Sequence, residues 1–437
     1  MSWYTILPSG IGLLLGLLLL GVPVFVAFLI LNVAGVLVLL GPPGFGMFAN
    51  SIYTTATLNS LSAVPLFILM GELLFKSGAM EVLFDSLDRL IGRMRGRQYF
   101  LCIALSAILG ALSGAAMAVA GLLGKSIFPT MLGRGYDKKL SAGTMLAGAS
   151  LDPIIPPSVL AIIIATLAQV STGKMLIAGV VPGLFLSGMF VVYVLVRIRL
   201  NPALAPDLIE EDAPKNQGSA LMALVKMLPC CFIFFLVMGL VMLGVATPTE
   251  AAATGVFGAL VLAWFYGGLS KKMLKDSIFS GINVAGLLLV VMSCATMFSQ
   301  LLTFTGALNE LGDLIVHLQI PSYAMLALML TTVFVLFMFL DQTALLMVLV
   351  PIFQPILRLY GWDPIWFWTL LLIMASVGGI SPPFGYTLFA FKSAVPDLSM
   401  SDIFKAAWPF VWIILLGVLA MIVFPQLITG LPALMQG

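Results

Sequence analysis

Histidine, cysteine and charged residues are all scarce in this sequence. His317 is the single histidine, and none of the four cysteines pairs with another at the spacing of metal ligands (Cys102, Cys230, Cys231 and Cys294). A histidine-based metal site or catalytic triad is therefore nearly excluded, and a disulfide framework is not expected. No Walker A or HExxH motif occurs, and no nucleophile stands with a base and an orienting group. We expect that the chain is not an enzyme, and ATP-driven pumping by this chain alone has no support.

Only 9% of the 437 residues are charged, whereas 61% are apolar. The net charge of +2 comes without a basic patch that interleaves with aromatic residues, so nucleic acid is not expected as a partner. Long apolar runs are typical of a chain that crosses a bilayer several times. We interpret these runs as helices, and the predicted fold class is an all-α polytopic membrane protein.

One apolar segment, about 140–170, is interrupted in its middle. Residues 148–158 contain three prolines and Asp152. They cannot continue a helix, because each proline lacks an N–H donor and clashes with the turn before it. Unpaired backbone groups in hydrocarbon are too costly unless protein or a water-filled cavity surrounds them. The segment therefore predicts a broken membrane helix whose irregular backbone is buried in protein.

A second apolar segment carries a matching interruption at residues 378–385. Pro156-Pro157 and Pro382-Pro383 are separated by 226 residues. The same offset relates Pro129 to Pro355, Gly135 to Gly361, Tyr136 to Trp362, and Asp137 to Asp363. Paired breaks in the two halves of a membrane protein point to the binding site of a transporter. The alternative is a pair of proline kinks that serve packing alone.

The order of segments predicts inverted structural repeats with about 10–11 transmembrane helices plus two re-entrant hairpins. Two short helices in 5–41 are expected to meet near residues 21–23, and the last span covers about 406–429. The other spans, including the two broken helices, are expected at about 58–75, 140–170, 175–196, 223–244, 250–268, 277–300 and 364–395. Amphipathic segments are expected at 77–97 and again from about residue 305.

The first hairpin is expected at about 99–132, with its tip at Ser113-Gly114, and the second at about 322–357, with its tip near Asp341. Basic residues flank the first hairpin on both sides, so its ends belong in the cytoplasm, whereas the second lacks basic flanks and enters from the periplasm. Five spans in each half is an odd number, which gives the halves inverted topology. Both chain ends are then predicted to be periplasmic.

This order divides the chain into a scaffold and a part that holds the breaks. We assign scaffold helices with an amphipathic arm to 1–98, hairpin 1 with its broken helix to 99–170, scaffold helices with a cytoplasmic linker at 197–222 to 171–304, a second arm to 305–321, hairpin 2 with its broken helix to 322–395, and a scaffold helix to 396–437.

Oxygen-bearing side chains gather at the breaks and at the hairpin tips. The hydroxyls of Ser150, Ser158 and Ser381, with the carbonyls that the breaks set free, suit a hard cation such as Na⁺. Helix N-termini exposed at the same places suit an anion. Asp152 and Asp341 are intramembrane carboxylates and therefore functional candidates. The alternative for each is a carboxylate that only caps a half-helix.

Further polar groups extend the candidate substrate site. Gln342 and Thr343 stand beside Asp341, and Ser299 lies on a polar helical face near the second hairpin. Such a face serves helix–helix packing equally well. The predicted substrate-binding residues are Asp341, Gln342, Thr343, Ser158 and Ser299. Glu72 faces either a polar interior or a partner, and the sequence does not choose between them.

These motifs resemble the large membrane subunit of a tripartite ATP-independent periplasmic (TRAP) transporter. The resemblance spans nearly the whole chain, and it rests on Val64-Pro65-Leu66-Phe67 with Gly71, Ser113-Gly114, Pro129 with Gly135-Tyr136, Ile155-Pro156-Pro157-Ser158, residues 246–253, Asp341 with Ala344, and Pro382-Pro383 with Gly385. The Pro-Pro-Ser and Thr-Pro-Thr-Glu-Ala-Ala-Ala signatures are specific when they occur together.

The resemblance implies an elevator-type transporter in the bacterial inner membrane, in which hairpins and broken helices carry substrate and Na⁺ across a static scaffold. It implies two partners, a small four-helix membrane subunit and a periplasmic substrate-binding protein. The implied cargo is a small organic anion, a carboxylate or a sulfonate. A self-sufficient ion-coupled organic-anion transporter, which needs no binding protein, is the alternative. A channel or a membrane enzyme is disfavoured, because neither a polar pore stripe nor a catalytic cluster is visible.

The resemblance also implies two sodium sites, one at each junction of a hairpin with a broken helix. The first would involve Ser113, Gly114 and the backbone of 149–153, with Ala149, Ser150 and Asp152. The second would involve Gly378, Ser381 and the backbone of Phe384. This sequence departs from the family pattern at Ala115, where serine is usual, at Ser381, where threonine is usual, and at Asp152. The two sites are therefore not expected to be equivalent.

Overall fold

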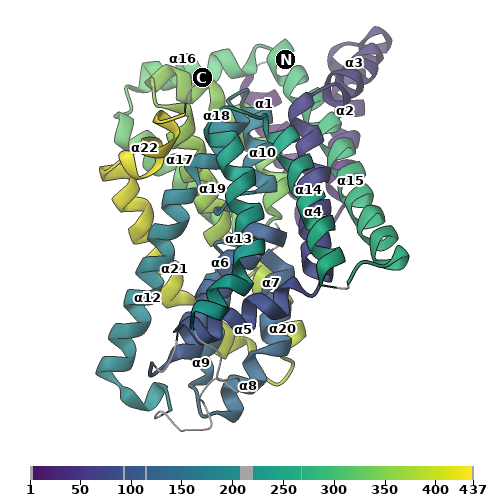
Figure 1. Ribbon diagram of the computed structural model, residues 1–437. Helices are drawn as coiled ribbons and strands as arrows, with labels where there is room; N and C mark the ends of the chain where they lie inside the picture. The colour runs from purple at the N-terminus through teal and green to yellow at the C-terminus, as the bar shows by residue number, and fades with distance from the viewer. Residues whose placement is uncertain (1–2, 92–93, 114–115, 207–219, 267, 436–437) are drawn as a thin grey trace.

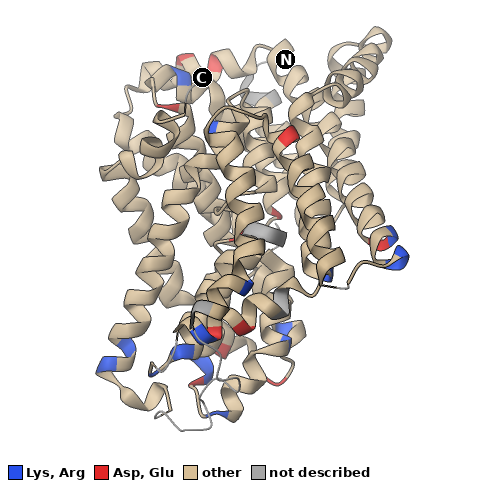
Figure 2. Ribbon diagram, in the orientation of Figure 1, with Lys and Arg blue, Asp and Glu red and all other residues tan. Residues whose placement is uncertain are grey.

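The computed structural model describes residues 3–91, 94–113, 116–206, 220–266 and 268–435, and in these ranges the chain is helical without a strand. The helices form a tall bundle with both termini at the same end (Figure 1). Lys and Arg residues lie mainly toward the opposite end (Figure 2). Within the described ranges, eight helical segments are long and apolar enough to cross a membrane. The predicted all-α polytopic membrane fold is confirmed.

One bundle consists of most of the helices that we predicted as scaffold near the start and in the middle of the chain. Its members are α1 (Trp3–Leu19), α2 (Val24–Leu39), α4 (Ala63–Lys76), α13 (Ala220–Met242), α14 (Pro248–Phe265) and α15 (Lys271–Phe304). Helix α4 packs against α14 and α15, and α2 packs against α15. The expected junction between the first two helices lies at Gly21, whose φ is +79°, and Pro23 precedes α2.

The two amphipathic segments are α5 (Ala79–Ile91) and α16 (Ala307–Leu318). Each begins after a glycine in the left-handed region, Gly78 at φ +81° and Gly306 at φ +69°. These glycines stand 228 residues apart, so the turn that opens each arm is repeated along with its sequence. Helix α5 packs against α13.

A helix that the sequence analysis did not predict, α3 (Gly46–Ala56), lies between the short 3₁₀ turns η1 (Pro42–Phe45) and η2 (Asn59–Ser62). Its polar residues hide it from a search for apolar runs. Ser51 donates a hydrogen bond to Gln300 at 2.9 Å, and Thr55 donates to Thr296 at 3.3 Å. The polar face of α15 therefore serves helix packing, which was the structural alternative for that face.

Two helix pairs correspond to the predicted hairpins. The first comprises α6 (Arg97–Ser113) and α7 (Ala116–Ser126), followed by the short α8 (Phe128–Gly133), and the second comprises α17 (Ser322–Phe337) and α18 (Gln342–Tyr360). Gly114, at the predicted tip of the first hairpin, lies outside the described residues.

Both broken helices are interrupted where the sequence predicts. Helix α9 (Lys138–Ala149) is separated from α10 (Val159–Leu167), and α19 (Pro364–Gly379) from α20 (Tyr386–Ala394). A cis Pro-Pro bond lies in each gap. Asp137 and Asp363 cap α9 and α19 in the same way, each accepting a hydrogen bond of 2.8 Å from the residue three positions on. The predicted repeat therefore extends from sequence to backbone geometry.

Four helices connect or follow these units: α11 (Thr172–Ala178), α12 (Val180–Leu200), α21 (Met400–Val423) and α22 (Gln426–Ala433). A 3₁₀ turn, η3 (Pro202–Leu204), follows α12, and residues 207–219 of the predicted linker lie outside the described residues. The last span begins at Met400, earlier than the expected 406, because Ser399 caps it, and it ends at Val423, before Pro425, rather than near 429.

Helices α12 and α21 pack against the broken helices more closely than the sequence division anticipates. Helix α21 contacts α9 and α19, and α12 contacts α21, α6 and α9. A Cβ placed on Gly179, just before α12, would lie 2.0 Å from the carbonyl oxygen of Ile154, and one placed on Gly183 would lie 2.4 Å from Ile155. Glycines here allow α12 to fit tightly against the first break. Our division of the chain into scaffold and moving parts stays a prediction, and this packing favours placing α12 and α21 with the broken helices.

Candidate functional site

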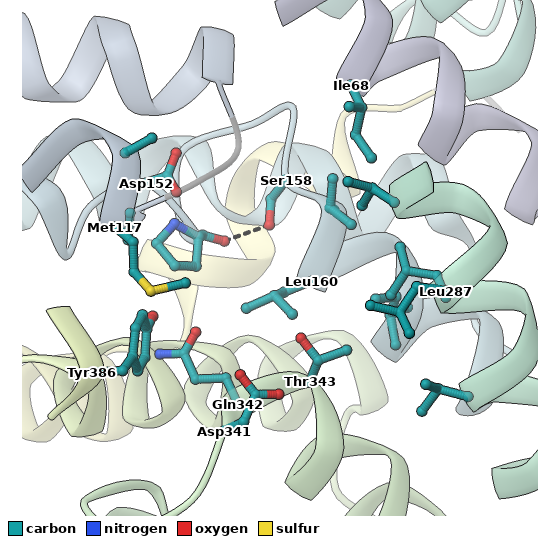
Figure 3. Close-up of a pocket in the computed structure, with 18 of the residues that line it drawn as sticks. Ile68, Met117, Asp152, Ser158, Leu160, Leu287, Asp341, Gln342, Thr343 and Tyr386 are labelled. Atoms are coloured by element: carbon teal, nitrogen blue, oxygen red, sulfur yellow. Dashed lines mark hydrogen bonds between the residues drawn. The ribbon is translucent and has the colours of Figure 1, made fainter. Parts of the chain in front are cut away.

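A cavity of about 680 Å³ lies where the scaffold bundle meets the first break and the second hairpin tip. Three scaffold helices form one side, with Val24 and Phe25 from α2, Ile68 and Phe75 from α4, and Leu287 and Val291 from α15 among their apolar residues. The opposite side carries polar groups from the two repeats (Figure 3). In that view Asp152 and Ser158 lie above the cavity, while Asp341, Gln342 and Thr343 lie below it.

Four helices of the hairpins and broken helices begin at this cavity, in addition to α2, which begins there at Val24. The first residues of α7, α10, α18 and α20 all line it, namely Ala116, Val159, Gln342 and Tyr386. Each helix N-terminus presents backbone N–H groups and the positive end of its dipole. The convergence follows from the repeat, because each hairpin and each break starts a new helix at the same depth.

The second hairpin tip supplies three of the predicted substrate residues. Asp341 is exposed and caps α18, where its Oδ1 accepts a 3.0 Å hydrogen bond from the Ala344 N–H. The Gln342 amide nitrogen donates to the Ala375 carbonyl of α19 at 2.5 Å, which fixes the tip to the second broken helix. Asp341, Gln342 and Thr343 all line the cavity. Asp341 therefore caps α18, and its carboxylate also faces the cavity.

Ser158 closes the first break from within. Its hydroxyl donates to the Pro153 carbonyl at 2.6 Å and accepts from the Ala161 N–H at 3.1 Å, so it caps α10 while it lines the cavity. Ser299 does not line the cavity. It lies on α15 one turn after Thr296 and next to Gln300. The hydrogen bonds of these two residues hold α3, so this part of α15 packs against α3.

Asp152 is buried in the first break, with 1% of its surface exposed. The Ala116 N–H at the start of α7 donates to its carboxylate, and its Oδ1 has no hydrogen-bond partner among the described residues. A Cβ placed on Gly110 of α6 would lie 3.0 Å from the Asp152 Cβ, so glycine at 110 makes room for this side chain. The equivalent position in the second repeat is Gly378, and there Phe337 fills the space, 2.3 Å from a placed Cβ.

The remaining predicted sodium ligands lie at the two breaks. The hydroxyl of Ser150 donates to the Ala147 carbonyl at 2.7 Å, and that of Ser381 donates to the Val377 carbonyl at 2.7 Å. A hydroxyl that gives its proton to a carbonyl keeps lone pairs that can accept a cation. Ala149 is buried beside Ser150, and Phe384 is 55% exposed, with its ring against Phe339. These oxygen donors, with the unpaired Asp152 oxygen, match the hard ligands that alkali and alkaline-earth cations prefer.

Ser113 ends α6, in the hairpin that leads to Ala116. Gly114, the other hairpin residue named for the first predicted sodium site, lies outside the described residues. The other named members of that site, Ala149, Ser150 and Asp152, lie together at the first break.

Two cavity groups escaped the sequence analysis as site residues. Tyr386 lies beside Gln342 (Figure 3), and its ring packs on Gly379, where a placed Cβ would lie 2.6 Å from the ring. The sequence offered one indication of this role, because Tyr386 is the first residue after the second break. Glu72 lines the cavity from α4, where it accepts a 2.9 Å hydrogen bond from Ser280 and pairs with Lys76 at 2.7 Å. Of the two alternatives for Glu72, the polar interior is therefore the observed one.

The charge of the cavity lining has one sign. Among the described residues that line it, Glu72, Asp152 and Asp341 are acidic and none is Lys, Arg or His. Apart from Lys76, which lies behind the lining and pairs with Glu72, positive potential at this place comes from helix N-termini, unless a cation binds. The arrangement suits an anion and a cation held close together.

A family model for the DctM component of tripartite ATP-independent periplasmic transporters matches residues 11–427. The chain belongs to this family. The resemblance drawn from the sequence motifs is thereby confirmed, and the site described above is that of a DctM-family permease.

Relatives of this permease cover nearly its whole length. The C4-dicarboxylate TRAP transporter large permease protein DctM of Pseudomonas aeruginosa is 27% identical over 92% of this chain and 93% of its own. A putative TRAP transporter large permease protein of Haemophilus influenzae is 30% identical over 96% and 97%. The ectoine TRAP transporter large permease protein TeaC of Halomonas elongata is 25% identical over 95% and 96%.

Solved structures resemble this permease in fold. The Alcanivorax borkumensis YdaH transporter superposes with a TM-score of 0.66 at 17% identity, over 89% of this chain and 91% of its own. At that identity the likeness concerns the fold alone. An elevator movement is consistent with this fold.

Proposed function

We propose that this DctM-family permease imports a small organic anion, a carboxylate or a sulfonate, together with Na⁺. The observation that carries the proposal is the convergence of four helix N-termini on a cavity whose only charged lining side chains, among the described residues, are acidic. An anion is held by the N–H groups and helix dipoles, and the acidic groups call for a cation beside it. Na⁺ bound beside the anion offsets the repulsion between the anion and the acidic side chains.

The proposed movement is an elevator. The cavity lies between the scaffold helices and the units that hold the breaks, so a shift of the second body against the first carries the site across the membrane. The apolar scaffold wall formed by α2, α4 and α15 suits such sliding, because it offers few groups that would bind the cargo. We propose the inner membrane as location, with both termini periplasmic, which agrees with the basic residues at the end opposite the termini (Figure 2).

The proposed partners are a small membrane subunit and a periplasmic binding protein that delivers the anion. The membership of a tripartite family supports both. No catalytic role is proposed for the chain. The alternative is a self-sufficient ion-coupled transporter that needs no binding protein.

Ser381→Ala is expected to weaken Na⁺ binding, because it removes the one side-chain ligand of the second proposed sodium site. The loss of a hydroxyl ligand to a cation corresponds to about a tenfold rise in the Na⁺ concentration for half-saturation. The measurement is a Na⁺ titration of the purified permease in lipid nanodiscs, with bound radioactive Na⁺ as the readout.

Ser393→Ala is the matched control. Ser393 also lies in the second repeat, and its hydroxyl also donates to the carbonyl four residues earlier, but it is exposed on α20. Its titration should match the wild type. An unchanged titration for Ser381→Ala would reject the second site as assigned.

A further inference from the structure

One hydrogen bond joins the two repeats at their centre. The Ser376 hydroxyl of α19 donates to the backbone oxygen of Ser150, the residue that ends α9. Both residues are 2% exposed. They stand 226 residues apart, which is the offset of the repeat, so each is the equivalent of the other. Equivalent residues touch only beside the axis that relates the repeats, and this contact therefore marks the axis.

The carbonyls at the end of α9 show why this bond matters. Those of Leu146, Gly148 and Ala149 accept from backbone N–H groups of residues 150–152, and that of Ala147 accepts from the Ser150 hydroxyl. These partners are all local. The Ser150 carbonyl instead receives its donor from the other repeat. A carbonyl at a helix end needs such a partner, because the next turn does not supply one.

The link runs in one direction. The Ser150 hydroxyl donates to the Ala147 carbonyl and therefore does not donate to α19. On the α19 side, the two residues after Ser376 both bind Ser381. The Val377 carbonyl accepts from the Ser381 hydroxyl, and the Gly378 carbonyl accepts from the Ser381 N–H. An ion bound at the second break therefore acts on the same turn that carries Ser376.

We propose that Ser376 is a positioning residue that couples the two proposed sodium sites to each other. This inference rests on the proposed Na⁺ coupling. An ion that binds Ser381 and the carbonyls near it fixes the end of α19 and with it the Ser376 donor. The donor holds the Ser150 carbonyl, and thereby the backbone of the first site, in one orientation. By linkage, an ion at the first site favours binding at the second to the same extent.

The function of such a link is to prevent transport with one ion bound. Two coupled sites fill together over a narrow range of Na⁺ concentration, whereas independent sites populate the singly loaded permease. Coupling through the Ser376 hydroxyl requires no large motion, because the two broken helices already meet at the axis. Ser376 contacts the Ser150 carbonyl and does not line the cavity, so its effect is on positioning alone.

The test is the shape of the Na⁺ binding curve of the whole purified permease in nanodiscs. For the wild type we expect a sigmoidal curve with a Hill coefficient that approaches about 2, the number of proposed sites. Ser376→Ala should lower it to about 1, since the sites then fill independently. Ser376→Thr keeps a hydroxyl at the same position and should restore the steep curve. Binding is followed with radioactive Na⁺, so the readout does not depend on transport.

A general loss of packing would not produce this pattern. Ser141→Ala is the matched control, because Ser141 is also buried in the first broken helix and donates within α9, to Asp137. It should keep the wild-type Hill coefficient. If Ser376→Ala does not yield a monodisperse protein, the Ser376→Cys variant, which keeps the side-chain size with a weak donor, should give an intermediate coefficient.

The outcomes separate the two proposals. A wild-type curve with a coefficient of about 1, or a Ser376→Ala curve as steep as the wild type, overturns the coupling while leaving Na⁺ binding intact. Absence of Na⁺ binding by the wild type overturns the proposed function, and the coupling with it.

Discussion

Gly179→Ala should abolish transport while the permease still folds. The substitution places a Cβ 2.0 Å from the carbonyl oxygen of Ile154, in the first break, whereas carbon and oxygen atoms in contact lie about 3.3–3.6 Å apart. The neighbour is backbone, so relief requires the break to move by more than about 1 Å. Displacements of that size at a binding site cost about a hundredfold in rate.

The backbone dihedral angles at Gly179 are ones that alanine adopts readily, so the expected loss comes from the clash alone. Gly179 has φ −77° and lies between two helices, so alanine suits its backbone and improves helix propensity. The control is Gly188→Ala in α12, where a placed Cβ meets nothing within 4 Å. Uptake should fall for Gly179→Ala and stay at the wild-type rate for Gly188→Ala. Equal uptake by both variants would show that the break does not depend on close contact with the start of α12.

The second large effect is expected for Asp341→Asn. Asparagine is as good an N-cap as aspartate, so the hydrogen bond to the Ala344 N–H and the fold of the hairpin tip should remain. The change removes the negative charge that faces the cavity. Loss of a charged contact costs about 1.5–3 kcal/mol, which corresponds to a fall in uptake of about tenfold or more.

Asp363→Asn separates the charge from the cap. Asp363 caps α19 through the same geometry, with a 2.8 Å hydrogen bond from the Trp366 N–H, but it does not line the cavity. Uptake by the Asp363→Asn variant should equal that of the wild type. The measurement is initial uptake into proteoliposomes, with thermal unfolding of each variant as the check on folding. Wild-type uptake by Asp341→Asn would assign Asp341 to a structural role.

The breaks and repeats were predictable because local chemistry dictates them. Prolines cannot continue a helix wherever they fall, and a repeated offset such as that of Asp137 and Asp363 needs no knowledge of packing. The predicted cavity residues Asp152, Ser158 and Asp341 followed from the same reasoning. Each is a polar group in an apolar segment, where burial without a function or a partner is costly.

What the sequence analysis missed depends on contacts between distant segments. Helix α3 is held by hydrogen bonds to residues of α15 that lie some 240 positions away, and nothing within Gly46–Ala56 reveals them. The same bonds explain why Ser299 is not at the cavity, since this part of α15 faces α3. Helix α12 looks like any apolar span, and only the fit of Gly179 and Gly183 against the first break shows which body it packs with.

The most direct test of the account is uptake by the reconstituted system. Proteoliposomes would contain the permease with or without its small membrane subunit, and the binding protein would be added outside with a labelled C4-dicarboxylate or ectoine, the cargo named for two relatives. The account predicts uptake only when both partners are present and an inward Na⁺ gradient is imposed. Uptake by the permease alone, at the same rate with K⁺ in place of Na⁺, would contradict it.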